Sequence, residues 1–295
     1  MSLVTAGSAS AQDCGFALAF QRPDERGSKT LNVYEAGQAG AIDGSRPLLF
    51  VSSLKVNTDG TAISYHPQDP RARTLAINNI LNAMRRGRTI SEFETAAASD
   101  WRPLDRTWAI LSDSVIERDR ATGGPCLTAQ GYLVSMTSDV AVNGGFNRVG
   151  DCDPTKWIDP LTVSSLVLPL GNTEFERRGA SNRTPVVAMT LGNGGRFAYG
   201  IVGDKGPANE LGEASVAMNR RLNGLPDTDR PANYSDAVAR FQAPSSAILL
   251  FPGMQNRAPR PLSDARVTTH AQALFERWGG RSRLEACLAE IPEAR

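Results

Sequence analysis

The fold of this chain is decided by Phe197-Ala-Tyr-Gly-Ile-Val-Gly-Asp-Lys-Gly-Pro-Ala-Asn-Glu-Leu-Gly-Glu-Ala-Ser-Val-Ala-Met-Asn-Arg-Arg-Leu222. Large and small side chains alternate over residues 197–202, which is typical of a strand packed on both faces. The glycine and proline at 206–207 then indicate a turn. From residue 214 apolar side chains recur at helical spacing, and Gly224 follows as a typical helix end. The stretch therefore predicts a strand, a turn and a helix in succession.

Two carboxylic acids lie in this stretch, Asp204 and Glu213. The pattern places Asp204 at the end of the strand and Glu213 in the first turn of the helix. Two carboxyl groups that face one cavity can flank a glycosidic bond, one protonated and one ionised, as hydrolysis of that bond requires. The plainer interpretation of the pair is a turn residue and a helix-start acid. The two residues alone leave both interpretations open.

A wider pattern surrounds the two acids. Each follows a glycine, as Gly203-Asp204 and Gly212-Glu213. Four further blocks occur in order along roughly residues 45–255: Asn57-Thr-Asp59-Gly60-Thr-Ala-Ile-Ser-Tyr65-His66-Pro67, Gly131-Tyr-Leu-Val-Ser135-Met-Thr137-Ser138, Trp157-Ile-Asp159-Pro with Leu166-Val-Leu-Pro169, and Leu249-Leu-Phe-Pro-Gly253. Together these blocks resemble the glycoside hydrolase family 75 chitosanases, in which a Gly-Asp and a Gly-Glu at this separation carry the catalytic acids.

The resemblance implies both a fold and an activity. Many short strands with a few helices already predict a mixed, β-dominated α/β fold, and the resemblance implies a closed β-barrel of the double-psi type. It implies an exported, endo-acting enzyme that cleaves β-1,4 bonds in glucosamine polymer with inversion, without a cofactor or a metal. Asp204 and Glu213 would be the catalytic pair, with Glu213 assigned as general acid and Asp204 as general base.

The same resemblance implies a set of substrate-binding residues: Asp59, Tyr65, His66, Ser135, Thr137, Lys205 and Asn209. Plainer interpretations stand beside two of them. Asp59-Gly60 is a turn signal in its own right, and His66 next to Pro67 can be a structural imidazole.

Two other functions also fit the sequence. The polymer could be peptidoglycan or another amino-sugar glycan, with the protein acting as an antibacterial effector. The helical insertion described below and the near-neutral charge motivate this alternative. A non-catalytic carbohydrate-binding protein on the same fold is the other, because a fold does not guarantee a function.

The net charge argues against binding to nucleic acid or to a membrane surface. The 295 residues include 32 basic and 31 acidic side chains, for a net charge of +1. We therefore expect no nucleic-acid binding by bulk electrostatics. No apolar run approaches the roughly 18–20 residues of a membrane span. The expected partner is a polysaccharide, and the oligomeric state is left open.

The cysteines and the first residues indicate export. Residues 1–12 end in an Ala-x-Ala pattern and are interpreted as the tail of an export signal before a single catalytic domain at 13–295. The four cysteines allow three disulfide pairings, of which we favour Cys14–Cys287 with Cys126–Cys152; four buried thiols are the alternative. The cysteine spacing does not suit zinc. The expected location is secreted or periplasmic.

The remaining elements are expected from local patterns. Strands are predicted within residues 15–56, 185–190 and 246–251, and two or three more within 131–170. Residues 70–125 form a helical insertion, with helices at 71–86 and 90–98 followed by strand-like residues from Trp101 to Ile110. Residues 262–295 are expected to dock on the barrel as an amphipathic helix interrupted at Gly279-Gly280.

Two side-chain groups have a functional and a plain interpretation. Trp101 and Trp108 could stack on sugar rings, although aromatic residues at this spacing are more often core. Asp151, Asp153 and Asp159 could hold calcium, but a solvated turn is favoured because a dedicated calcium loop is missing.

Overall fold

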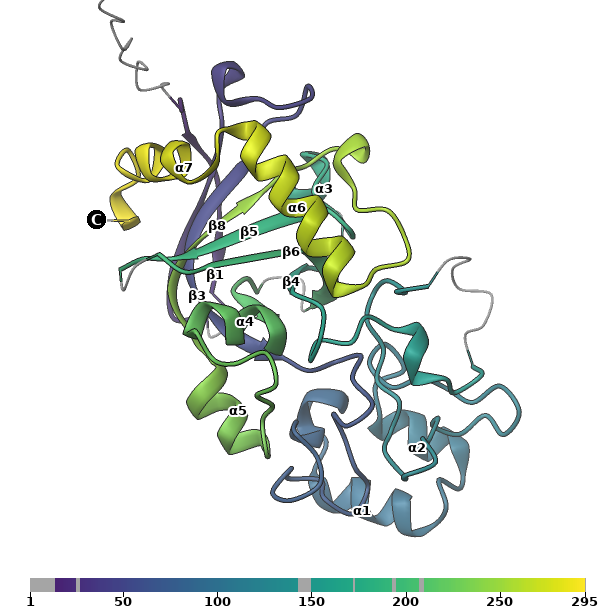
Figure 1. Cartoon of the computed structure of the whole chain (residues 1–295). Coiled ribbons are helices and arrows are strands. Elements are labelled where there is room, and N and C mark those ends of the chain that lie inside the picture. Colours follow the sequence, from purple (N-terminus) through teal and green to yellow (C-terminus); the bar gives the residue numbers. More distant parts are fainter. Residues whose placement is uncertain are drawn as a thin grey trace, which may run out of the picture.

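The computed structural model describes residues 14–24, 27–142, 150–171, 173–192, 195–206 and 210–294. In these residues a single eight-stranded sheet dominates the upper part of the molecule, and helices surround it (Figure 1). The strands are β1 (Ala17–Pro23), β2 (Thr30–Glu35), β3 (Leu48–Asn57), β4 (Ser165–Pro169), β5 (Pro185–Thr190), β6 (Phe197–Gly206), β7 (Glu213–Ser215) and β8 (Ala243–Leu250).

Six of these strands close into a barrel. Their order is β3-β7-β4-β6-β5-β8, and β8 pairs back onto β3. The β3–β7 and β4–β6 pairs are parallel, and the other pairs are antiparallel. The expected β-dominated mixed fold is confirmed, and the closed barrel is consistent with the double-psi type.

Both surfaces of the barrel wall are buried, which explains the long apolar runs in its strands. Along β3, Leu48 and Phe50 belong to the cluster that fills the barrel, whereas Leu49 packs outside it. The outer cluster is covered by α6 (Asp264–Trp278), which contributes Phe275 and Trp278, and by α7 (Gly280–Leu288), which contributes Leu284 and Leu288. Figure 1 shows α6 lying across β5 and β6. Gly279, at φ +124°, separates the two helices.

Three shorter helices also flank the barrel. They are α3 (Glu174–Arg177), α4 (Val216–Asn223) and α5 (Tyr234–Phe241). The end of α4 is as expected, because Gly224 adopts the left-handed conformation.

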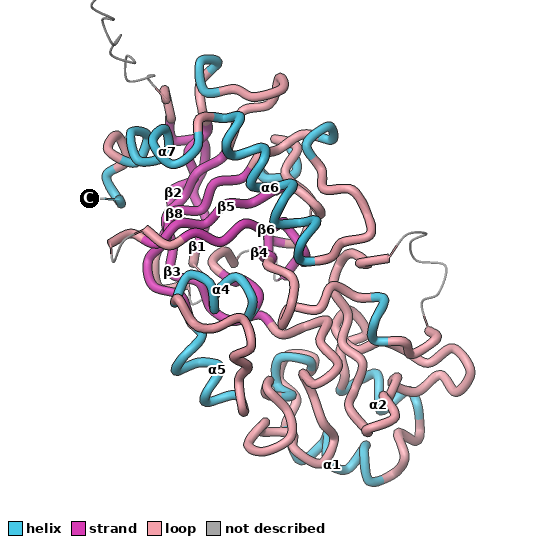
Figure 2. Tube along the Cα trace, viewed as in Figure 1, coloured by secondary structure: helices cyan, strands magenta, loops and turns pink. Residues whose placement is uncertain are grey.

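The segment between β3 and β4 forms a second lobe that consists mainly of loops (Figure 2). It contains α1 (Ile90–Ala98) and α2 (Leu104–Ile110), and Thr89 begins α1 with a capping box. The lobe has its own hydrophobic cluster, which includes Trp101 and Trp108. Because both indoles are buried in that cluster, the plain interpretation of them as core residues is correct.

The helix expected over residues 71–86 is wrong. Only a short 3-10 helix, Ile80–Ala83, forms there. The carboxylate of Asp69 accepts hydrogen bonds from the backbone N–H groups of four residues between 73 and 76. Those donors are held by a side chain instead of by helical carbonyls, which gives the chain an alternative to a helix.

Two strand expectations also fail. Residues 104–110 form α2 and not a strand, because Trp108 and Ile110 turn onto the lobe's cluster at helical spacing. Two or three strands were expected within 131–170, and among residues 131–142 and 150–170 the one regular strand is β4. Residues 131–135 contribute isolated bridges, such as Tyr65 with Leu133 and Ile116 with Ser135.

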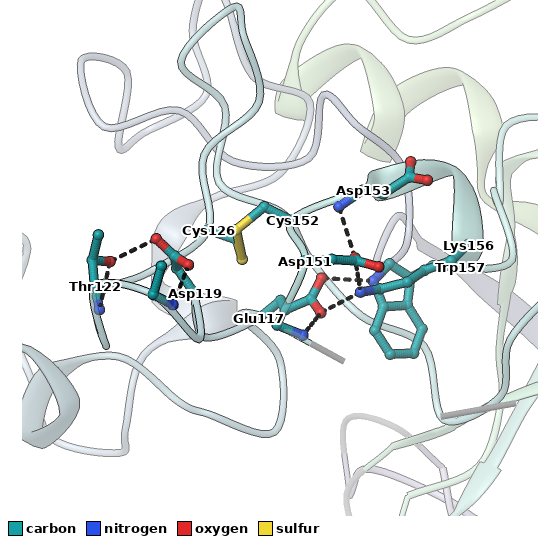
Figure 3. The surroundings of a disulfide bond; sticks show 12 residues. Glu117, Asp119, Thr122, Cys126, Asp151, Cys152, Asp153, Lys156 and Trp157 are labelled. Atoms are coloured by element: carbon teal, nitrogen blue, oxygen red, sulfur yellow. Dashed lines mark hydrogen bonds and ion pairs between the residues drawn. A yellow bond between two sulfur atoms is a disulfide. The ribbon is translucent and has the colours of Figure 1, made fainter. Parts of the chain in front are cut away.

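Two disulfide bonds confirm the favoured pairing, Cys14–Cys287 and Cys126–Cys152. Figure 3 shows the second bond beside a buried ion-pair cluster in which Lys156 contacts both Glu117 and Asp151. Asp153 accepts from Thr155 and Asp159 from Leu161, so these two carboxylates serve local turns. In the described part of the chain, no helix is long and apolar enough to cross a membrane.

Candidate active site

A cleft of about 740 Å³ separates the barrel from the second lobe. The barrel side supplies residues of β3, β6 and β7, among them Lys55, Asp204 and Glu213. The lobe side supplies Ile77, Asn78, Asn82, Ser114 and Val115, and α5 adds Tyr234 and Val238 at one end. The insertion at 70–125 therefore forms one wall of the cleft.

Asp204 and Glu213 reach the cleft from strands on either side of β4. Both pair with the same β4 residue, Val167, Asp204 across the parallel ladder and Glu213 across the antiparallel one. Directly paired residues place their side chains on one face of a sheet. Two strand spacings put the Cα atoms of the two acids roughly 10 Å apart. The sheet thus brings the two expected acids to one cavity.

The local structure of both acids differs from the sequence expectation. Strand β6 continues two residues beyond Asp204, because Lys205 and Gly206 still pair with β4. Glu213 belongs to strand β7 and not to a helix. Helix α4 begins later, since the Ser215 hydroxyl accepts from Met218 N and makes Ser215 the N-cap.

The Asp204 carboxylate is held by three donors. Oδ1 accepts from the backbone N–H groups of Ser138 (2.7 Å) and Lys205 (2.8 Å), and Oδ2 accepts from Asn57 Nδ2 (3.2 Å). These hydrogen bonds favour the ionised form, yet burial outweighs them and raises the pKa of Asp204 to about 6. The group is therefore ionised at neutral pH and fixed in orientation.

Asp59 is a third carboxyl group in the cleft, and its surroundings differ from those of Asp204. Its Oδ1 accepts one hydrogen bond, from the Tyr65 hydroxyl at 2.7 Å. Burial, together with the charge of Asp204, raises the pKa of Asp59 to about 7. Tyr65 is fully buried in the second lobe, and burial next to Asp59 raises the pKa of its hydroxyl well above the ordinary value.

Lys205 lines the cleft beside Asp204 and forms an ion pair with Glu176 of α3. Glu210 also lines the cleft, although the sequence did not single it out. The expected substrate-binding residue Asn209 lies outside the described residues.

His66, Ser135 and Thr137 are buried and do not belong to the described lining of the cleft. His66 Nδ1 accepts from Gln68 N, and its ring packs edge-on against Tyr132. The Ser135 hydroxyl accepts from Gly60 N at 2.9 Å, and Thr137 Oγ1 accepts from Ile158 N at 3.3 Å. Ser135 thus holds the turn that carries Asp59, Thr137 binds the backbone at Ile158, and His66 fills a structural position.

Among the polar residues of the lining that sequence reasoning missed are Asn57, Asn78 and Ser138. Asn57 and Ser138 stood inside the quoted motifs, so the signal was present, but their partner Asp204 is far away in the sequence. Asn78 fell in the segment that was expected to be helical. Its Nδ2 donates to the Tyr65 hydroxyl at 2.9 Å.

The charged residues of the described lining are four acids and two lysines: Asp59, Asp204, Glu210, Glu213, Lys55 and Lys205. Within the described ranges, no group of three or more His, Cys, Asp or Glu side chains is arranged to hold a metal ion. No protein-family model and no curated protein matches this chain by sequence. The geometry of the cleft and the residue motifs therefore carry the functional proposal.

Proposed function

We propose that this protein is a glycoside hydrolase that cleaves β-1,4 bonds in a glucosamine polymer with inversion. The observation that carries the proposal is the placement of Asp204 and Glu213 on strands either side of β4, with both side chains lining one cleft. An inverting mechanism needs two carboxyl groups about 6.5–9.5 Å apart, with room for a water molecule between the sugar and the base.

We assign the two acids different roles. Asp204 is the general base, since three donors favour its ionised form and fix its oxygens. It accepts a proton from a water molecule whose oxygen attacks the anomeric carbon. Glu213 is the general acid and transfers its proton to the glycosidic oxygen as that bond breaks. The product carries the opposite anomeric configuration, and no covalent intermediate forms.

The charge of the cleft supports a cationic polymer. Its described lining carries an excess of acids over lysines although the whole chain is nearly neutral. Protonated glucosamine units are attracted by such a lining, whereas an anionic glycan gains less from it. Peptidoglycan or another amino-sugar glycan remains the alternative substrate, because the second lobe forms a wall of the cleft that can select the polymer.

The disulfide bonds support export. Disulfides persist in oxidising compartments and are rare in the cytosol, and both cysteine pairs of this chain are bonded. We propose that the protein works outside the cell or in the periplasm.

The direct test is release of reducing ends from soluble chitosan by the wild type, Asp204→Asn and Glu213→Gln. The rate of reducing-end release should fall about 10²-fold or more in both variants, which is the scale for loss of a general acid or base. Asp105→Asn and Glu94→Gln are matched controls, because both residues are exposed on helices of the second lobe. They should retain wild-type rates. Wild-type activity on peptidoglycan alone would establish the alternative substrate, and inactivity on both polymers would favour a binding protein.

A further inference from the structure

Three aspartates of this chain differ in how many donors hold them. Asp69 accepts four backbone N–H hydrogen bonds, and its pKa is lowered to about 2. Asp204 accepts three hydrogen bonds, and Asp59 accepts only the one from Tyr65. Donors stabilise the ionised carboxylate. Of the three, Asp59 is the carboxyl group whose contacts do least to hold it ionised.

A hydrogen-bonded chain fixes Asp59 in this position. Asn82 Nδ2 donates to Asn78 Oδ1 (2.7 Å), Asn78 Nδ2 donates to the Tyr65 hydroxyl (2.9 Å), and that hydroxyl donates to Asp59 Oδ1. On the barrel side, Asn57 accepts from Asp59 N (2.6 Å) and donates to Asp204 Oδ2. The chain therefore connects the second lobe to Asp204 through the position of Asp59.

The second oxygen of Asp59 has a different status. In the described part of the chain, Oδ2 has no hydrogen-bond or ion-pair partner, and Asp59 lines the cleft. The charged groups that face it across the cleft are Asp204 and Lys205 on β6, Lys55 on β3, Glu213 on β7, and Glu210. Asp204 is the one whose charge raises the pKa of Asp59 directly.

We propose that Asp59 is a third functional carboxyl group, which stays protonated and donates a hydrogen bond from Oδ2 to an oxygen of the bound glycan. This role rests on the proposed function and adds to it, because Asp204 and Glu213 still transfer the protons of the reaction. The pKa of Asp59, raised to about 7 by burial and by the charge of Asp204, agrees with a group that is neutral at mildly acidic pH. Environments that separate two neighbouring carboxyl groups in this way assign them different tasks.

The test compares Asp59→Asn with Asp59→Ala. Asparagine reproduces the hydrogen bonding of the neutral acid, because its Oδ1 can accept from Tyr65 and its Nδ2 can donate into the cleft. At pH 6 we expect kcat/KM of Asp59→Asn on a glucosamine hexamer to fall by no more than about threefold. Asp59→Ala should lose about tenfold or more, since a donor is missing.

The pH dependence separates a donor from a merely structural residue. Asp59 ionises in the wild type as the pH passes about 7 and then ceases to donate, whereas an asparagine does not titrate. The ratio of Asp59→Asn to wild-type kcat/KM cancels every titration that the two proteins share. We expect this ratio to rise about tenfold from pH 6 to pH 8, as the neutral fraction of a group of pKa about 7 falls.

Three outcomes overturn the inference. A loss in Asp59→Asn as large as in Asp204→Asn would make Asp59 a proton-transfer group, and wild-type rates in Asp59→Ala would remove it from the site. A ratio that does not change with pH would show that Asp59 is not neutral.

If the wild type hydrolyses no glycan, the proposed function fails. Calorimetric binding of the glucosamine hexamer then decides: weaker binding by Asp59→Ala alone supports the donor, and equal or absent binding by all three proteins contradicts it.

Discussion

The glycine next to Asp59, Gly60, packs directly against Ile158 and Thr137. Gly60 adopts φ +104°, and a Cβ there would overlap the Ile158 carbonyl oxygen and lie 2.6 Å from Thr137 Cγ2. We expect Gly60→Ala to lower the free energy of unfolding by about 1–2 kcal/mol for its backbone conformation and about 1–3 kcal/mol more for the overlap. Urea denaturation measures the loss.

Gly44→Ala is the matched control for this glycine. Gly44 also has a positive φ, +75°, but nothing lies within 4 Å of its Cβ position. Gly44→Ala should lower the free energy of unfolding only by the cost of the backbone conformation, about 1–2 kcal/mol. Equal losses in the two variants would mean that the contact with Ile158 and Thr137 is not tight.

The pKa of Asp204 predicts an acid limb in the pH profile. A general base acts in its ionised form, and burial raises the pKa of this carboxyl from 3.8 to about 6. kcat/KM on chitosan should therefore fall about tenfold per pH unit below pH 6. The amino groups of the polymer stay largely protonated in that range, so the limb belongs to the enzyme. A limb that begins near pH 4 would show an Asp204 without this shift.

At the residue scale, sequence motifs located the acids but not their surroundings. Asp59, Asp204 and Glu213 were all singled out, and all three line the cleft. The interpretation of Asp59-Gly60 as a turn is confirmed, and the turn directs the carboxyl group into the cleft, whereas the role of Asp59 in substrate binding stays a prediction. What the motifs could not predict is the donor count at each acid, which depends on Asn57, Ser138 and Tyr65 meeting in space.

At the element scale, a buried ion-pair cluster within the second lobe joins residues 150–157 to Glu117 (Figure 3). Glu117 is fully buried and accepts from Gly150 N, Lys156 Nζ and Trp157 Nε1. Lys156→Met leaves that carboxylate without its cation and should lower the free energy of unfolding by about 3–5 kcal/mol. Chemical denaturation measures it.

Two further variants give this prediction its controls. Arg88→Met breaks the exposed pair with Glu92 and should lower the free energy of unfolding far less than Lys156→Met does. Adding Glu117→Gln to Lys156→Met removes the uncompensated charge and should recover part of the loss. A small effect of Lys156→Met would mean that water or another group already compensates Glu117.

The elements that the sequence predicted well are those with a local cause. Helix α1 has its expected bounds because Thr89 and Glu92 form the capping box within one turn. The helix at 71–86 failed because a side chain outside the pattern, Asp69, captures its N–H groups. The prediction that Glu213 begins a helix was wrong for a nonlocal reason. Glu213 lies in β7, which forms by pairing with β3 on one side and β4 on the other.

At the scale of the whole molecule, barrel closure was implied by the resemblance and not by periodicity. Local patterns predict strands within residues 15–56 and at 246–251, but they cannot show that β3 and β8 pair with each other across nearly 200 residues. The second lobe was expected as an insertion, yet its position as a wall of the cleft appears only in the folded structure. That wall supplies the polar chain that ends at Asp59.

The central claim is tested most directly by the anomeric configuration of the first product. NMR spectra of a glucosamine hexamer, recorded during cleavage by the wild type, show which anomer appears before mutarotation. The arrangement of Asp204 and Glu213 on either side of β4 predicts the α anomer from a β-1,4 bond, and no product with Asp204→Asn. The β anomer as first product, or cleavage that survives Asp204→Asn, would contradict a two-carboxylate inverting hydrolase.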